Sequence, residues 1–470
     1  MNATSLVRRN LLEWPPLRRA LMSAWFPLVL QVLALIGMTA LALNGWGLGA
    51  DLPAKDLMTL RKTNATTLAV WGLWWPGMIV VAILAGRLWC TVCPMELASR
   101  AGHAMGRRFG LAKLPLGRVL RAGWLILAAY VVLQLLVAGL SIHRVPHYTS
   151  LMLATMGGLA LGVGIFFREE RAFCKSFCPA AALLSVYGRF TRIQLDKVDA
   201  QTCASCTTKD CVKAANRDRF DARSCPSLIR PFDRNPSDGC VLCFQCAKVC
   251  PQANIGFGTT TAEAGSRRRQ LLKPFEAGFV MIAAGFVSHE VIGEVKWLDV
   301  LFHQVPSLLN RSFHRIEFGW FEALWFLVLF PAFFWALIAG GARLLGHRER
   351  LGSLLLAATT GAAPVVALAH LAKAMAKLGS WGGFAPLALH DPKGMAALGA
   401  LGSHQMAAPA ALWGLSILGW LLLPGMALLG WRVIGWFRQH PEKAHLPGLR
   451  MGFMGAAAFY SAVLLVWMHG

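Results

Sequence analysis

The sequence lacks the motifs that hold several common cofactors. It has no C-x-x-C-H motif, so a covalently attached c-type haem is not expected. It has no G-x-G-x-x-G motif and no Walker loop, so neither dinucleotide nor nucleotide chemistry is indicated. Charge is also scarce. Only 15% of the 470 residues are charged, whereas 56% are hydrophobic, which directs attention to the membrane.

Twelve cysteines fall into four groups, and none lies outside them. One group has the spacing C-x2-C-x2-C-x3-C-P, a bacterial iron–sulfur run whose fourth cysteine ligates the neighbouring cluster. A second run has three closely spaced cysteines and a fourth after a longer gap. Buried small hydrophobes or disulfides would predict scattered positions instead. The two runs are Cys240, Cys243, Cys246 and Cys250 with Pro251, and Cys203, Cys206, Cys211 and Cys225 with Pro226.

The crossing pattern of two-cluster ferredoxins assigns the ligands of two [4Fe–4S] clusters. A zinc site is the alternative that Cys-x2-Cys pairs allow, but the third close cysteine and the proline after each fourth one favour iron. The departure from the pattern is the thirteen-residue spacer before Cys225. The first predicted cluster is held by Cys203, Cys206, Cys211 and Cys250, and the second by Cys225, Cys240, Cys243 and Cys246.

Hydrophobic stretches of about 20 residues predict membrane-spanning helices. We therefore expect an all-α polytopic membrane protein of about nine transmembrane helices, with an inserted cytoplasmic ferredoxin-like two-cluster domain. The first stretch is too long for a cleavable signal peptide and has no small-residue cleavage site. The nine predicted spans are roughly 22–47, 66–86, 119–141, 150–167, 273–293, 319–344, 353–376, 409–435 and 450–468.

The distribution of Lys and Arg predicts the orientation. The basic loops fall on one side if nine helices alternate, which makes the N-terminus cytoplasmic and the C-terminus periplasmic in a bacterial inner membrane. The chain has a net charge of +23, and its basic residues flank the predicted membrane spans. The expected partner is therefore anionic lipid and not nucleic acid.

The long polar segment 169–272 holds all eight cysteines of the two runs. It predicts a small cytoplasmic domain folded around its clusters, in a compartment that keeps thiols reduced. The expected domains are therefore 1–168, with four helices as two hairpin repeats, then 169–272, and then 273–470, with the last five helices.

An internal repeat links this domain to the membrane. Each hairpin ends in a basic residue, an aromatic residue, two cysteines and a proline, and both pairs emerge at the cytoplasmic face. The dipole of the following helix favours a thiolate or an anionic cluster. We predict a third [4Fe–4S] cluster here; a redox-active dithiol pair and unligated structural cysteines stay as alternatives. The repeated cysteines are Cys90 and Cys93 before Pro94, and Cys174 and Cys178 before Pro179.

These motifs together resemble the bacterial membrane polyferredoxins over about residues 60–260. That group includes the quinol-dehydrogenase subunit of periplasmic nitrate reductase, the electron donor and maturation protein of nitrous-oxide reductase, and the iron–sulfur protein of cbb-type oxidase assembly. Cys174, Cys178 and Pro179 match the group's Cys-x3-Cys-Pro, whereas the spacing of Cys90 and Cys93 is one residue shorter. Residues 270–470 resemble no family.

Two histidines lie within otherwise apolar predicted helices. His289 and His370 are 16 and 17 residues from the cytoplasmic start of their helices, so they share a depth near 25 Å. Ionisable groups at such positions are functional candidates. Bis-histidine haem b ligation, a quinol site with Glu290 as proton acceptor, and purely structural histidines all remain open.

The sequence thus favours an electron-transfer protein that links the quinone pool, or a periplasmic or membrane oxidoreductase, to a chain of [4Fe–4S] clusters. Whether it is itself a quinol dehydrogenase-type oxidoreductase is left open. A metallocentre assembly factor that reduces copper or a disulfide is the alternative, and a transporter or sensor with regulatory clusters is a third.

Overall fold

The computed structural model describes residues 7–191, 193–227, 229–230, 239–260, 271–313, 315–414, 418, 420, 422–428 and 446–469. Within these residues helices dominate, and seven are long and apolar enough to cross a membrane. The prediction of an all-α polytopic membrane protein is confirmed. The seven candidate spans are Leu28–Gly45, Ala65–Ala85, Pro146–Phe166, Pro274–Ile292, Phe318–Leu344, Leu351–Gly382 and Pro447–His469.

Two predicted spans differ from these seven. The third, 119–141, is divided by Gly123, whose φ of 86° ends helix α8 (Arg118–Arg121) before α9 (Trp124–Gly139) begins. The 16 residues of α9 give a helix about 24 Å long, shorter than a hydrocarbon core of about 30 Å. The eighth predicted span, 409–435, lies partly outside the described residues, which include only 409–414, 418, 420 and 422–428 of it, so it stays a prediction.

The chain forms two compact units, each assembled from separate stretches of sequence. The first comprises Met1–Ala40, Val81–Ile126 and Ala154–Gln270. The second comprises Leu41–Val80, Leu127–Leu153 and Leu271–Gly470. The boundaries expected for a separate domain at 169–272 stay a prediction.

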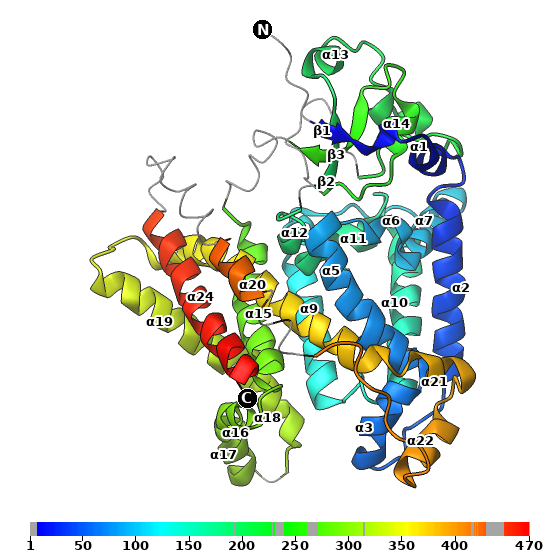
Figure 1. The fold of residues 1–470 in the computed structure, drawn as a ribbon. Helices are drawn as coiled ribbons and strands as arrows, with labels where there is room; N and C mark the ends of the chain where they lie inside the picture. Colours follow the sequence, from blue (N-terminus) through cyan, green and yellow to red (C-terminus); the bar gives the residue numbers. More distant parts are fainter. Residues whose placement is uncertain are drawn as a thin grey trace. The chain divides into compact units, whose positions relative to one another are not determined.

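A three-stranded antiparallel sheet belongs to the first unit (Figure 1). The strands lie in the order β1 (Val7–Asn10), β3 (Ile255–Thr260), β2 (Ile193–Lys197). A Cβ at Gly258 would lie 1.7 Å from the Arg9 carbonyl oxygen, so the β1–β3 pairing requires glycine there. The sequence had not indicated that the N-terminal tail contributes a strand.

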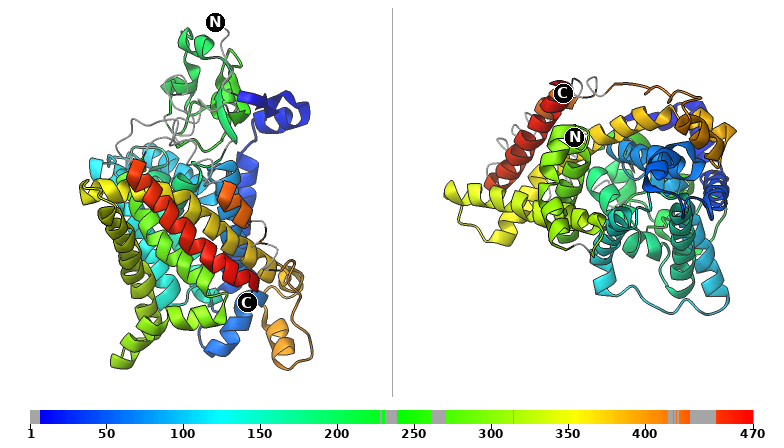
Figure 2. Two further views of the ribbon diagram at one scale, coloured as in Figure 1. Left: turned by 60° about the vertical axis from the view of Figure 1, so that its left-hand side comes forward. Right: turned by 90° about the horizontal axis from the view of Figure 1, so that it is seen from below.

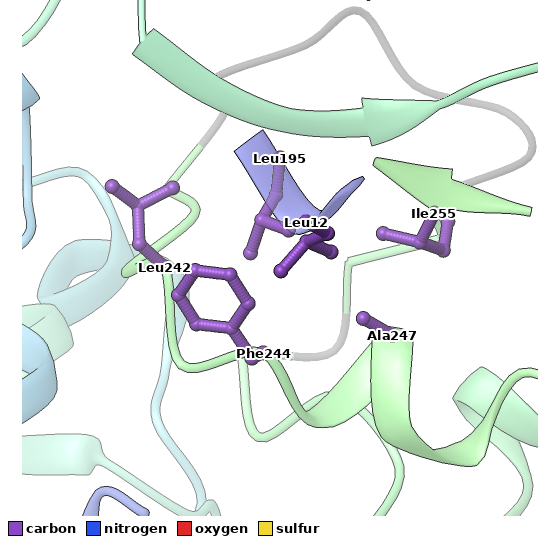
Figure 3. Close-up of a cluster of buried hydrophobic side chains, with 6 residues drawn as sticks. All are labelled: Leu12, Leu195, Leu242, Phe244, Ala247 and Ile255. Carbon is purple, nitrogen blue, oxygen red and sulfur yellow. The ribbon is translucent and has the colours of Figure 1, made fainter. Parts of the chain in front are cut away.

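A compact apolar cluster lies beside this sheet (Figure 3). Leu12 follows β1, whereas the other members come from residues 195–255, so the cluster ties the N-terminal tail to the cysteine-rich segment. Cys240, Cys246 and Cys250 pack against it. Its six members are Leu12, Leu195, Leu242, Phe244, Ala247 and Ile255.

Helix α7 (Pro94–Arg108) packs closely against α10 (Pro146–Phe166) in the first unit. A Cβ at Gly102 would lie 2.2 Å from the Leu161 carbonyl oxygen, and one at Gly106 would lie 2.0 Å from that of Ile165. Small residues thus let the two backbones touch, as at many membrane helix interfaces.

In the second unit, α15 (Pro274–Ile292), α20 (Leu351–Gly382) and α24 (Leu446–His469) lie side by side (Figure 2). Glycine again permits the contact, because a Cβ at Gly361 would lie 2.0 Å from the Leu449 carbonyl oxygen. The other elements of this unit include α3 (Ala54–Thr63), α16 (Lys296–Phe302), α17 (Gln304–Ser312), α18 (Phe318–Leu324), η6 (Trp325–Leu329), α19 (Phe330–Leu344), α21 (Ala385–His390) and α22 (Met395–Gly402).

Candidate metal centres

The first predicted set of four cysteines lines a single pocket. The last member arrives at the C-terminal end of α14 (Gln245–Val249), as the crossing pattern requires. The Asn254 side-chain amide donates a hydrogen bond to the Cys203 sulfur at 3.4 Å. The pocket-lining cysteines are Cys203, Cys206, Cys211 and Cys250.

The second set lines another pocket, together with Leu195, Phe244 and Ile255. The long spacer before Cys225 does not displace it, because its backbone N–H donates to the Cys211 carbonyl oxygen at 2.8 Å. The pocket-lining cysteines are Cys225, Cys240, Cys243 and Cys246.

The loop that carries this second set is wound tightly. Leu242 and Phe244 both have left-handed backbones, with φ of 56° and 59°. Non-glycine residues rarely adopt this conformation, and such strain concentrates at functional sites. With this backbone conformation, the side chains of Leu242 and Phe244 both lie in the apolar cluster (Figure 3).

The third set comes from the two repeats. Cys90 lies in α6 (Trp89–Val92) and Cys93 directly before α7, whereas Cys174 lies in α11 (Ala172–Ser176) and Cys178 before Pro179. The close packing of α7 on α10 brings the two turns together. Cys174, Cys90 and Cys178 all interact electrostatically with Cys93.

These thiols are hard to ionise without a cation nearby. Burial, reinforced by neighbouring thiols, raises the pKa of Cys178 to about 12. In the second set, burial and Cys225 likewise raise the pKa of Cys243 to about 12. None of the twelve cysteines forms a disulfide. A soft metal that neutralises four thiolates fits each set.

A buried charge network adjoins the third set. The Glu96 carboxylate lies 4.0 Å from Arg171 Nε and 3.6 Å from an Arg223 guanidinium nitrogen. It also accepts a 2.6 Å hydrogen bond from Gln31. Burial disfavours the charge of Arg171, but Cys174 and Glu96 raise its pKa above the ordinary value. Sequence reasoning missed this network; the only signal was the basic residue that recurs before each cysteine pair.

The two predicted histidines have different surroundings. His289 lies beside His303 and Glu322, which the prediction did not include, with ring centroids of the two histidines 5.3 Å apart. His370 meets the ring of Phe286 edge-on. Glu290 interacts electrostatically with both His370 and His289.

Comparison with known proteins gives a limited set of relatives. The chain is 32% identical over 186 residues to the uncharacterized protein MJ0749 of Methanocaldococcus jannaschii. This match covers 39% of this chain and 69% of MJ0749. It is 26% identical over 193 residues to MJ0750 of the same organism, also uncharacterized, with 38% and 75% covered.

A relative with a descriptive name comes from Paracoccus denitrificans. The methylamine utilization ferredoxin-type protein MauN is 26% identical over 138 residues, which is 26% of this chain. The match covers 47% of MauN, less than half of its length. No family model and no solved structure matches the chain.

Proposed function

The chain belongs to the same protein family as the uncharacterized protein MJ0749, and from that premise we propose that it is a membrane iron–sulfur protein that transfers electrons. The observation that carries the proposal is the gathering of twelve cysteines into three sets of four. The ferredoxin-type name of MauN agrees with it.

Three [4Fe–4S] clusters are the occupants that suit these sets best. Each set offers four sulfur donors, which is the ligand chemistry that such clusters take. A bound cluster supplies a one-electron carrier. The protein's own contribution is burial, hydrogen bonds to sulfur such as that from Asn254, and the nearby Arg171–Glu96 charges.

The sets adjoin one another through short connections. The first and second meet at the hydrogen bond from the Cys225 N–H to the Cys211 carbonyl oxygen. The second and third meet where the Thr91 hydroxyl donates to the Val241 carbonyl oxygen. We infer an electron relay in the order first, second, third.

The electron source that we propose is quinol, at a site beside His370 and Glu290. Both residues lie within candidate spans, where ionisable groups are costly and functional. Glu290 would take up a proton released by quinol. The alternative occupant of this region is a b-type haem ligated by His289 and His370.

The variant His370→Gln tests the quinol site. It should abolish reduction of the clusters by quinol but not by dithionite. If a haem is bound instead, the native protein should show the absorption spectrum of a bis-histidine haem.

The sheet supports one element of the proposed topology. Because β1 pairs with β3, the N-terminal tail and the cysteine-rich segment share one side of the membrane. An even number of spans must therefore separate Asn10 from Ile193, which requires the short helix α9 to cross. We propose that this side is the cytoplasm of a bacterial cell and that the C-terminus is periplasmic, where an oxidoreductase partner docks. Reporter fusions after Arg268 and after Gly470 should localise to opposite sides.

Metal analysis of anaerobically purified protein tests the central proposal. We expect about twelve irons and twelve sulfides per chain, because a [4Fe–4S] cluster holds four of each. Cys178→Ser should remove about four irons, whereas Ser176→Ala, between Cys174 and Cys178, should remove none. About eight irons in the native protein would leave the third set as thiols, and zinc in place of iron would refute electron transfer by these sets.

The alternative of a metallocentre assembly factor uses the same clusters but a different acceptor. In that case reduced protein would pass electrons to a copper ion or to a protein disulfide. Mixing dithionite-reduced protein with either acceptor, and following reoxidation of the clusters, separates this function from electron exchange with quinone alone.

A further inference from the structure

The second unit contains none of the twelve cysteines, and three of its other residues converge. His289 comes from α15, His303 follows α16, and Glu322 lies in α18. Their candidate ligand atoms all lie within 4.8 Å of one another. The Glu322 Oε1 atom is 3.1 Å from His303 Nε2 and 3.9 Å from His289 Nε2.

The hydrogen bonds of His303 require a positive charge. Its Nε2 faces the Glu322 carboxylate, whereas its Nδ1 lies 2.8 Å from the Asp299 carbonyl oxygen and 3.0 Å from Asp299 Oδ1. Both nitrogens thus face acceptors, but a neutral imidazole has only one N–H. Either the ring is an imidazolium, or a metal cation takes the place of the Nε2 proton. In the second case Nδ1–H still donates to Asp299, the arrangement that usually orients a metal-binding histidine.

The ring nitrogens of His289 have fewer hydrogen-bond partners than those of His303. Its Nδ1 is buried and has no hydrogen-bond partner among the described residues, and its Nε2 is 3.9 Å from the nearest carboxylate oxygen. A buried polar atom without a partner costs about 1–3 kcal/mol. The ring is held by stacking on Phe326, with centroids 4.9 Å apart and planes 13° apart. A cation bound between His289 Nε2 and Glu322 Oε1 would give Nε2 a bond, whereas Nδ1, on another side of the ring, would stay without a partner among the described residues.

We propose that His289, His303 and Glu322 bind one divalent first-row transition-metal cation. Two imidazole nitrogens and one carboxylate suit zinc, iron(II) and related ions, and three protein ligands leave a coordination position open. Tetrahedral bonds of about 2.0–2.1 Å place ligand atoms about 3.4 Å apart. The 3.9 Å separation of His289 Nε2 and Glu322 Oε1 would have to shorten by about half an ångström. Phe302 and Phe318 pack against the histidine rings and limit access of water.

Cobalt(II) titration of the full-length, iron-loaded protein in detergent tests the site. We expect one Co²⁺ per chain, with d–d absorption and no thiolate charge-transfer band. His303→Gln and Glu322→Gln should each weaken binding at least about tenfold, and Asp299→Ala about 10- to 100-fold. The exposed His390→Gln is the matched control and should bind like the native protein. Iron content and elution volume report whether each variant folds.

A second measurement needs no variant. X-ray absorption of the zinc-loaded native protein should show nitrogen and oxygen at about 2.0–2.1 Å with imidazole scattering, and no sulfur near about 2.3 Å. Failure to bind Co²⁺, unchanged binding in both His303→Gln and Glu322→Gln, or a sulfur shell would overturn the proposal. A b-type haem spectrum that His289→Gln abolishes would also overturn it. Loss of iron from the cysteine sets would bear only on electron transfer, so the two proposals fail separately.

Discussion

The Thr91 hydroxyl donates a hydrogen bond to the backbone carbonyl oxygen of Val241. Thr91 lies between the two cysteines of the first helix-end pair, and Val241 lies between Cys240 and Cys243. A single side chain therefore joins two cysteine loops that are 150 residues apart in the sequence. Both residues are buried, so water cannot replace the bond if it is lost.

Replacing Thr91 by the isosteric valine should destabilise the first unit. The Val241 carbonyl oxygen would lose this hydrogen bond, at a cost of about 1–3 kcal/mol. A lower melting temperature, measured by circular dichroism, checks this. Thr39→Val is the control, because the Thr39 hydroxyl bonds within its own exposed helix turn. Equal melting temperatures for the two variants would contradict the prediction.

Replacing Glu96 by glutamine should be far more damaging than a comparable change at the surface. It leaves Arg171 and Arg223 without their buried counter-charge, which typically costs about 3–5 kcal/mol. Asp218→Asn breaks an exposed ion pair with Arg107 and should cost about 0–1 kcal/mol. Chemical denaturation of both variants measures the difference; similar losses would mean that the network is solvated.

Replacing Gly106 by alanine should separate α7 from α10. The new Cβ would meet the Ile165 carbonyl oxygen at 2.0 Å, and the displaced α7 would carry Cys93 away from Cys174. We expect a loss of about four irons with the other eight retained. Gly162→Ala, in α10, meets nothing within 4 Å and should keep all the iron. Full iron retention in Gly106→Ala would show that the contact does not position the third set.

Thiol labelling of cluster-free protein should depend on pH differently at Cys206 and Cys178. A hydrogen bond with the Thr208 hydroxyl lowers the pKa of the partly exposed Cys206, whereas burial raises the pKa of Cys178 to about 12. Only thiolates react, so at about pH 8 Cys206 should be alkylated at least about a hundredfold faster. The rate at Cys178 should keep rising up to about pH 12. Peptide mass spectrometry gives both rates, and equal rates would mean that Cys178 is accessible.

The cysteine sets were the part of the site that sequence could predict. Iron–sulfur spacing is local, so the motif names its ligands before the fold is known. The approximate bounds of most spans could also be predicted from the sequence, because the thickness of the bilayer limits the length of a spanning helix. The break at Gly123 was not, since a glycine inside an apolar run does not reveal a positive φ.

The pairing of His289 with His370 stays a prediction, and it shows what sequence reasoning cannot provide. Counting residues along a helix gives depth but not the direction in which a side chain points, so His289 and His370 were paired on depth alone. In the structure His289 lies with His303 and Glu322. The segment between His289 and Glu322 contains two short helices, α16 and α17, and a turn. Hydrophobic periodicity does not predict how such a segment folds. The Glu96–Arg171 pair was missed for the same reason, because its members are 75 residues apart.

The N-terminal strand also imposes an order on biosynthesis. Asn10 leaves the ribosome first, yet its partner Gly258 is made 248 residues later. At about 5–20 residues per second, that interval lasts about 12–50 s. Throughout it the tail must wait at the membrane surface while the intervening helices insert. The sheet, and the apolar cluster that Leu12 completes, can close only after the last cysteine has been translated. Clusters held by the proposed cysteine sets would therefore assemble late, after the last strand of the sheet has been translated.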